Sequence, residues 1–247
     1  QATNLATLNP EIKKAPRPLV LTDLGKLILE EDPYFEDALT LWLIHVELAS
    51  NKELATLWYL LFNEYGNRDF NKERSSIFIQ DVLEVSGHRD QVTDKAIESD
   101  FACFLRTYFA SGDRGYVSSA EIDCPLSSLS LIRGSSIANS YRFAIGPRKE
   151  IPVEVFAYVV YKLQSALSST SQTLTLENLR YSPLSPGKLL CMDNRAIAER
   201  LEDLEDHPLR LARMSRAGGL NSVILNPDIS ELGIIKNYFQ QEVTAGV

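Results

Sequence analysis

The sequence predicts a mainly α-helical protein that carries small β-hairpins. Over most of the chain, apolar residues recur three and four positions apart, which is the spacing of one face of an α-helix. Alternation of apolar and polar residues, which is typical of a half-buried strand, is limited to short segments such as residues 140–145. The 247 residues are 45% hydrophobic and 23% charged, which is an ordinary globular composition with a length that suits one or two domains. The sequence has no apolar run of about 18 residues, so it predicts no transmembrane helix.

The first half of the chain predicts an extended segment and then a helical domain. Residues 1–20 contain three prolines and are expected to be extended. Thr22 is a suitable N-cap for the first helix, which Asp32-Pro33 ends. The spacing predicts four more helices, over about 34–49, 52–65, 71–85 and 94–109. Together they define a predicted helical domain over residues 21–132.

A basic connection is predicted over residues 133–150. Between Arg133 and Lys149 the sequence has four basic residues and no acidic one. Such a stretch suits contact with phosphate groups, and it equally suits an ordinary solvated surface.

Residues 151–247 predict a winged-helix-like C-terminal domain. Three helices are expected, over about 152–167, 175–179 and 193–204, with a turn at residues 185–187. Two short strands follow, over about 209–214 and 220–225, and then a last helix over about 229–241. Three helices followed by a two-stranded ribbon is the order of a winged helix, a variant of the helix-turn-helix.

Five basic residues of this domain are candidates for DNA binding. Lys188 and Arg195 lie beside or on the third helix, whereas Arg210, Arg213 and Arg216 lie on the ribbon. Arginines on a ribbon next to glycines can follow a phosphate backbone, and each phosphate contact adds a salt-dependent contribution to the affinity. The third helix also carries five acidic residues, which would repel DNA if they faced it. Docking of a protein partner is therefore the alternative.

A catalytic site is harder to find, because no familiar nuclease signature stands out. Asp37 and His45 share one face of a predicted helix, and Glu64 would come near if that helix paired with the next one. A nuclease site of Asp37, His45 and Glu64 is one hypothesis, since phosphodiester cleavage uses carboxylate-bound metals or a histidine. The alternative is that His45, which lies in an apolar run, is a hydrogen-bonded core residue.

The cysteines indicate a reducing compartment. Cys103, Cys124 and Cys191 are odd in number and far apart, which excludes a disulfide framework and a zinc knuckle. We therefore expect a cytoplasmic protein. The cysteines suit small core residues, and the alternative of a sulfur carrier would need a reactive, exposed thiol.

Several short segments resemble those of one bacterial family. They lie at residues 21–25 (LTDLG), 31–45 (DPY, ED, TLW and IH), 62–64, 105–108, 124–126, 185–188 (SPGK) and 216–218. By these segments the chain resembles the SspB-type family of bacterial DNA phosphorothioation defence systems, long described only as a domain of unknown function. In that family a winged-helix-like segment precedes LTDLG. Residues 1–20 would then be the remnant of an N-terminal winged helix.

The resemblance implies a DNA-binding protein of an antiviral system that replaces a phosphate oxygen of DNA by sulfur. It further implies DNA-nicking endonuclease activity, for which Mg²⁺ or Mn²⁺ is the expected cofactor, and no other cofactor is expected. The implied protein partners are a cysteine desulfurase, an ATPase and a sulfur-transfer protein. It assigns no catalytic residue.

The rival hypothesis is a non-catalytic scaffold that binds DNA or a partner and delivers the modification enzymes. In that case the acidic helical half, with 17 acids and 7 bases over residues 21–100, would dock a basic partner.

Overall fold

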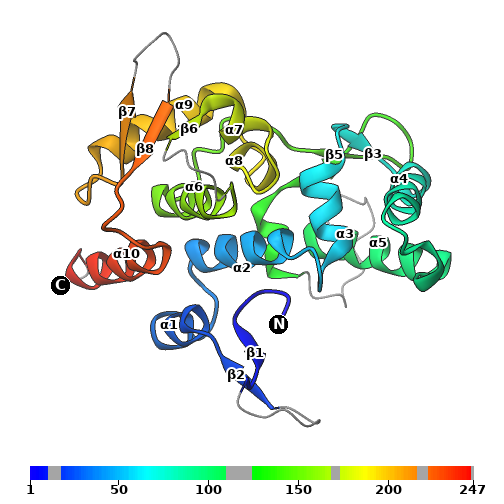
Figure 1. The fold of residues 1–247 in the computed structure, drawn as a ribbon, viewed down its shortest axis with the longest axis horizontal. Coiled ribbons are helices and arrows are strands. Elements are labelled where there is room, and N and C mark those ends of the chain that lie inside the picture. The colour runs from blue at the N-terminus through cyan, green and yellow to red at the C-terminus, as the bar shows by residue number, and fades with distance from the viewer. Residues whose placement is uncertain (11–17, 110–123, 168–172, 216–221, 246–247) are drawn as a thin grey trace. The chain divides into compact units, whose positions relative to one another are not determined.

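A computed structural model describes residues 1–10, 18–109, 124–167, 173–215 and 222–245 (Figure 1). The described chain is mainly α-helical with small antiparallel sheets, as the sequence predicts. It divides into two compact units. Unit 1 comprises Gln1–Leu48 and Gly146–Val247, and unit 2 comprises Ala49–Ile145. None of the described helices is long and apolar enough to cross a membrane.

Unit 1 begins with a β-hairpin in the segment that the sequence predicts to be extended. Strand β1 (Ala6–Leu8) pairs antiparallel with β2 (Leu19–Leu21), and helix α1 (Asp23–Glu31) follows. Thr22 caps α1 as predicted, because its hydroxyl oxygen accepts a hydrogen bond from the Gly25 N–H at 3.0 Å. Gly25 is required here, since a Cβ at this position would lie 1.9 Å from the Leu5 carbonyl oxygen. The LTDLG segment therefore joins the hairpin to α1.

The core of unit 1 surrounds helix α6 (Val153–Leu167). Every residue from Val155 to Tyr161 is buried, because other helices contact α6 on several sides. Its helical neighbours are α2 (Ala38–Ser50), α10 (Glu231–Ala245), α9 (Asn194–Asp206) and the short α8 (Pro186–Leu189).

A three-stranded antiparallel sheet completes unit 1. Strand β6 (Thr173–Thr175) precedes α7 (Leu176–Tyr181), and strands β7 (Ala212–Ser215) and β8 (Ser222–Leu225) follow α9. The strand order is β6-β8-β7. Each of these strands has only three or four residues, which explains why β6 leaves no alternating pattern in the sequence.

The turn predicted at residues 185–187 is wrong, because Ser185 is the N-cap of α8. Pro186 occupies the first turn of that helix, where its missing N–H has no cost. Gly187 allows α8 to approach α7, since a Cβ here would lie 2.3 Å from the Arg180 carbonyl oxygen.

Unit 2 is built around a cluster of aromatic rings. Its elements are α3 (Thr56–Tyr59), a π-helical turn (Leu60–Glu64), β3 (Asp69–Phe70), α4 (Lys72–Val85), a 3₁₀ turn (Arg89–Gln91), α5 (Asp94–Tyr108), a second 3₁₀ turn (Pro125–Leu129), β4 (Ile132–Gly134) and β5 (Tyr141–Phe143). The strands form an antiparallel sheet of order β3-β5-β4. Phe70, on the inner face of this sheet, contacts the rings of Phe101, Phe104 and Phe143. The helix predicted over 52–65 begins later and ends in the π-helical turn, where the buried Asn63 amide donates to the Ala49 and Tyr59 carbonyl oxygens.

The compact units have different bounds from the predicted domains. The sequence predicts domains over 21–132 and 151–247, whereas the units divide after Leu48 and after Ile145. The reason is long-range packing: α1 contacts α10, and Glu47 on α2 is bonded to α6. The first 48 residues therefore belong with the C-terminal part of the chain.

Candidate nucleic-acid interface

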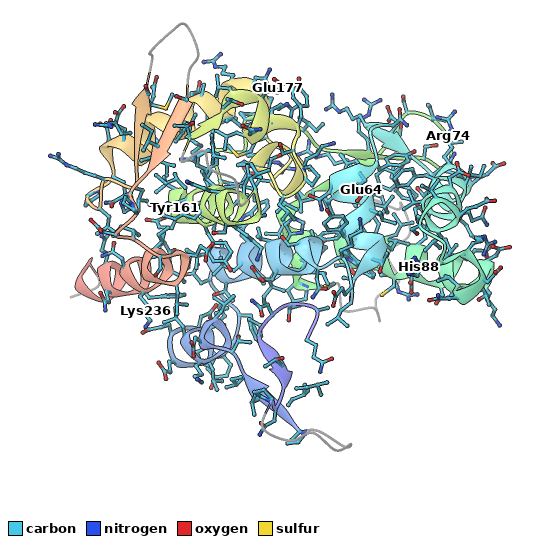
Figure 2. The ribbon with its side chains drawn as sticks, in the orientation of Figure 1. Glu64, Arg74, His88, Tyr161, Glu177 and Lys236 are labelled. Carbon is cyan, nitrogen blue, oxygen red and sulfur yellow. The ribbon has the colours of Figure 1, made fainter. Side chains whose placement is uncertain are left out.

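The β7–β8 ribbon is anchored at its base to the central helix of unit 1. The Tyr161 hydroxyl on α6 lies 2.8 Å from the Leu211 carbonyl oxygen and 3.1 Å from that of Asn226, so it can donate to either. Burial raises the pKa of Tyr161 to about 12, so this phenol keeps its donor hydrogen at neutral pH. Figure 2 labels Tyr161 on α6. The ribbon is thus held by a fixed hydrogen bond and not by apolar packing alone.

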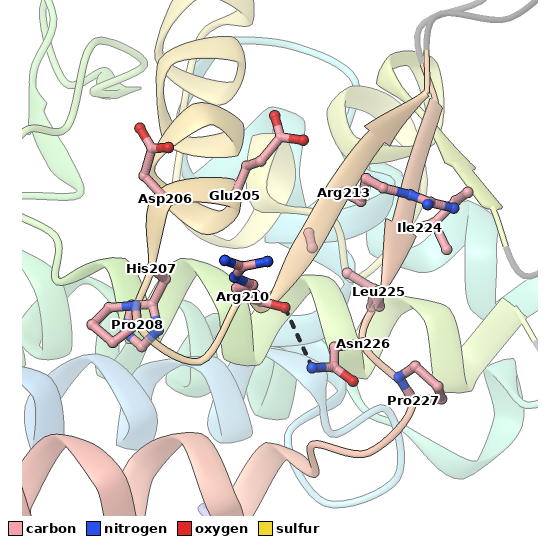
Figure 3. A pocket seen from close by; sticks show the side chains of 11 residues that line it. Glu205, Asp206, His207, Pro208, Arg210, Arg213, Ile224, Leu225, Asn226 and Pro227 are labelled. Atoms are coloured by element: carbon pink, nitrogen blue, oxygen red, sulfur yellow. Dashed lines mark hydrogen bonds between the residues drawn. The ribbon is translucent and has the colours of Figure 1, made fainter.

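A groove of about 770 Å³ lies between the end of α9 and this ribbon (Figure 3). Glu205 and Asp206 line it from α9, and Arg210 and Arg213 line it from the ribbon side. The Asn226 side-chain amide donates to the Arg210 carbonyl oxygen at 3.4 Å, as the dashed line in Figure 3 marks. The groove therefore carries both signs of charge.

Arg210 and Arg213 are both exposed, but the prediction of a ribbon position is wrong for Arg210, which precedes the ribbon because β7 begins at Ala212. Arg213 lies opposite Ile224 in the register of β7 with β8, on the outer face of the ribbon, while the neighbouring Ala212 and Val223 are buried. Among the described residues, neither Arg210 nor Arg213 forms an ion pair. Arg216, the third predicted ribbon arginine, lies outside the described residues. Arg210 and Arg213 are thus available to an external anion.

The basic residues of α9 have partners within the protein. Arg195, whose side chain is 88% exposed, pairs with Glu199 at 2.7 Å. Arg200 donates to the Lys149 and Ile151 carbonyl oxygens at 2.9 and 2.7 Å, so it holds the chain that leads into α6. The exposed positions of α9 are mostly acidic: Glu199, Glu202, Asp203, Glu205 and Asp206.

Lys188 is half-buried and lies near Arg180, a residue that is not among the candidates from the sequence. Burial, and next the nearby charge of Arg180, lower the pKa of Lys188. Arg180 donates to the Met192 carbonyl oxygen and, at 3.4 Å, to that of Gly187. Arg180 therefore links α7 to the chain between α7 and α9. Its partners are backbone carbonyl groups, which every residue has, so the sequence does not indicate this role.

The candidate catalytic residues do not form one cluster within a unit. Asp37 and His45 lie in unit 1, and Glu64 lies in unit 2. Asp37 accepts a hydrogen bond from the Leu39 N–H at 2.7 Å, and the Tyr238 hydroxyl lies 3.3 Å from its carboxylate. Glu64, labelled in Figure 2, pairs with Lys52 at 3.0 Å. Eight residues of helix separate Asp37 from His45, a rise of about 12 Å, which is too far for both to bind one metal ion.

His45 has the environment of a core histidine. It has no exposed surface, and its Nε2 lies 2.8 Å from the Leu189 carbonyl oxygen. Its ring meets that of Trp42 edge-on at 5.9 Å. Burial lowers the pKa of His45 to about 4, so the ring is neutral at pH 7 and donates to Leu189.

No metal-binding group is found in the described part of the chain: no three or more His, Cys, Asp or Glu side chains lie together so that they could hold an ion. Of the cysteines, Cys191 is buried, as its apolar sequence context predicts, and Cys124 is half-buried. The prediction of a core residue is wrong for Cys103, which is exposed on α5.

The basic stretch of residues 133–149 is divided between the two units. Arg148 is only 5% exposed and pairs with Glu150 at 3.1 Å. Arg142, in unit 2, binds both carboxylate oxygens of Asp69 at 2.8 and 3.0 Å. The sequence does not reveal Asp69 as a partner of Arg142, because the two residues lie 73 positions apart and Asp69 is on a two-residue strand.

Comparison with known proteins identifies the family. The chain matches the family described as "Protein of unknown function (DUF4007)" over residues 1–239, and it therefore belongs to that family. Its fold is similar to that of a protein described as "SspB crystal structure", with a TM-score of 0.83 and 20% identity over 97% of this chain and 72% of that chain. It is also similar to "Magnesium ion-bound SspB crystal structure", with a TM-score of 0.81 and 21% identity over the same shares. None of the curated proteins matches the chain.

Proposed function

We propose that this protein is a DNA-binding component of a bacterial DNA phosphorothioation system and acts as a DNA-nicking endonuclease. The observation that carries the proposal is the similarity to SspB over 97% of the chain, which agrees with the LTDLG, DPY and SPGK segments of the sequence. In the proposed system, the protein works with a cysteine desulfurase, an ATPase and a sulfur-transfer protein in the bacterial cytoplasm.

The order of elements in unit 1 supports a winged-helix arrangement for the DNA-binding part. Helix α6, strand β6, helices α7 and α9, and the β7–β8 hairpin follow one another as in a winged helix, and β6 pairs with β8 as the third strand. In this arrangement α9 corresponds to the recognition helix and the β7–β8 ribbon to the wing.

The charges of unit 1 favour the ribbon over α9 as the DNA-contacting element. Arg210 and Arg213 are exposed, and neither β7 nor β8 carries an acidic residue. On α9, by contrast, Glu199 neutralises Arg195, and the remaining exposed acids would repel phosphates. We therefore place the main phosphate contacts on Arg210 and Arg213, with Arg216 beyond them in sequence. Lys188 and Arg195 contribute less to the DNA affinity in this proposal.

Mg²⁺ or Mn²⁺ is the proposed cofactor of nicking, and one of the similar proteins is described as magnesium ion-bound. The described residues of this chain do not fit such an ion, because they contain no cluster of metal-binding side chains. Asp37 and Glu64 stay the first candidates for mutation in a test of catalysis. His45 is completely buried, so DNA cannot reach it unless the core opens.

A supercoiled-plasmid assay tests the nicking activity. The proposal predicts conversion to the open-circular form in the presence of Mg²⁺ or Mn²⁺ and none after addition of a chelator. Plasmid that stays supercoiled in every condition, at protein concentrations that shift its band, would overturn the endonuclease part of the proposal.

A second candidate function is a non-catalytic scaffold, and the acidic face of α9 favours it. Glu202, Glu205 and Asp206 are exposed next to one another, and a basic partner surface would complement them. The two functions differ in one result: a scaffold binds DNA or a partner protein but leaves the plasmid intact.

A further inference from the structure

The small sheet of unit 2 has one apolar and one charged face. On the inner face, Phe70, Phe143 and Ile132 are buried. On the outer face, Asp69 of β3, Arg142 of β5 and Arg133 of β4 form one row, because Asp69 lies opposite Arg142 and Arg142 lies opposite Arg133 in the two registers. Side chains that lie opposite each other on antiparallel strands share a face of the sheet.

Two like charges lie opposite each other in this row. Like charges directly opposite on neighbouring strands are destabilising, and Arg133 lies opposite Arg142. Asp69 compensates only Arg142, through hydrogen bonds from Nε and Nη2, and it also accepts a hydrogen bond from the Ser135 hydroxyl at 3.0 Å. Arg133 is exposed and forms no ion pair with a described residue. Two like charges on one face of a small sheet contribute nothing to folding by pairing with each other, which is a sign of a functional surface.

We propose that Arg133 and Arg142 form a second DNA-contact site, which binds a phosphate of the duplex backbone between their guanidinium groups. The Asp69 contacts leave the two hydrogens of Arg142 Nη1 for another acceptor. A guanidinium group matches a phosphate in geometry and in charge. An anion that bridges the two arginines would also remove the repulsion between them. This inference rests on the proposed DNA-binding function and adds a site in the other unit.

The surroundings of the two arginines suit a nucleic-acid backbone better than an acidic protein. The residues that join β4 to β5 include Ser136 and Asn139, which are exposed. Serine and asparagine side chains are frequent donors to phosphate oxygens. The segment from Pro125 to Ile145 has no acidic residue, and Arg68 adds a third positive charge near Asp69. The tyrosine of this segment, Tyr141, packs against Phe70 and Phe109 on the inner face and is not part of the site.

Replacement of Arg133 separates the proposed role from a structural one. Arg133→Ala removes one phosphate contact, and Arg133→Glu creates an opposite-charge pair with Arg142. We expect both variants to bind a labelled DNA duplex less tightly. At the same time, Arg133→Glu should melt at a higher temperature than the wild type, because a cross-strand repulsion becomes an attraction. If Arg133 had only a structural role, a variant that binds DNA less tightly would also melt at a lower temperature.

The measurement is fluorescence anisotropy of the labelled duplex over a series of salt concentrations. For Arg133→Ala we expect the slope of log K against log salt to fall by about 0.9, the value for one phosphate contact. Arg106→Ala is the matched control, because Arg106 is an exposed arginine on the outer face of α5 in the same unit, and its slope should equal that of the wild type.

Arg213→Ala, in the ribbon, serves as the reference for the proposed function. If Arg213→Ala weakens binding while Arg133→Ala and Arg106→Ala do not, the second site is overturned and the proposed function stands. If Arg133→Ala weakens binding while Arg213→Ala does not, the second site stands and the ribbon placement is overturned. A wild-type protein that does not bind the duplex overturns both.

Discussion

Lys162 on α6 places its ammonium group 2.7 Å from Oε1 of Glu47, a carboxylate on α2 that is only 4% exposed. The Tyr158 hydroxyl, one turn earlier on α6, donates to the same oxygen at 2.7 Å. Burial, and next the charge of Glu47, raise the pKa of Tyr158, so this phenol stays a donor. Two donors from one helix thus hold a buried charge of another, and this contact keeps α2 in unit 1.

Replacement of Lys162 by methionine should therefore destabilise the protein. The variant keeps the length of the side chain but leaves the Glu47 carboxylate buried with one donor, which costs on the order of 2–4 kcal/mol. Urea denaturation measures this change in the free energy of unfolding. Lys52→Met is the matched control: its pair with Glu64 is more exposed, with 59% and 29% of the side chains accessible, so the loss should stay below about 1 kcal/mol. Equal losses in the two variants would contradict the importance of the buried pair.

The buried His45 should make stability depend on pH. The folded state resists protonation until about pH 4, whereas the unfolded chain binds the proton near pH 6.5. Below pH 6.5 protons therefore favour the unfolded chain. The contribution of the neutral His45 to the free energy of unfolding is about 3 kcal/mol. It is fully present above pH 6.5 and is lost as the pH falls to about 4.

His45→Gln keeps a donor for the Leu189 carbonyl and has no proton to gain. In denaturation curves between pH 7 and pH 4, the variant should lose less stability than the wild type. His88→Gln, at an exposed position, should follow the wild-type curve. A His45→Gln variant that loses stability as steeply as the wild type would show that His45 is not the titrating group.

The glycines of the LTDLG and SPGK segments, Gly25 and Gly187, should tolerate no side chain. In Gly25→Ala the new Cβ would meet the Leu5 carbonyl oxygen at 1.9 Å, and in Gly187→Ala it would meet that of Arg180 at 2.3 Å. Both contacts involve backbone, which cannot rotate away, so each variant should lose about 1–3 kcal/mol in the free energy of unfolding. Gly66→Ala, where nothing lies within 4 Å of the new Cβ, should change stability little. Thermal melting of the three variants tests this prediction: the melting temperature should fall in Gly25→Ala and Gly187→Ala and change little in Gly66→Ala.

The fold could be predicted from the sequence where the signal is local. Thr22 caps α1 as predicted, because capping depends on neighbouring residues alone. Strands β1, β3 and β6 could not be predicted, since two or three residues carry no alternation and the prolines before β2 suggest a loop.

The candidate site could be predicted only in part. The ribbon and its Arg213 follow from the sequence, but the partners of Arg200 and Arg142 do not. Arg200 bonds to carbonyl groups about 50 residues away, and Arg142 bonds to a carboxylate 73 residues away. The partners of a basic residue can therefore lie in distant parts of the chain, where no local pattern in the sequence indicates them.

The most direct test of the DNA-binding proposal is the salt dependence of duplex binding by the wild type, the double variant Arg210→Ala/Arg213→Ala and Arg195→Ala. Two lost phosphate contacts should lower the slope of log K against log salt by about 1.8 in the double variant. Arg195→Ala should stay close to the wild type, because this arginine pairs with Glu199 on a helix whose other exposed acids repel phosphates. A double variant that keeps the wild-type slope, with Arg195→Ala reducing it, would contradict the ribbon and place the DNA on α9.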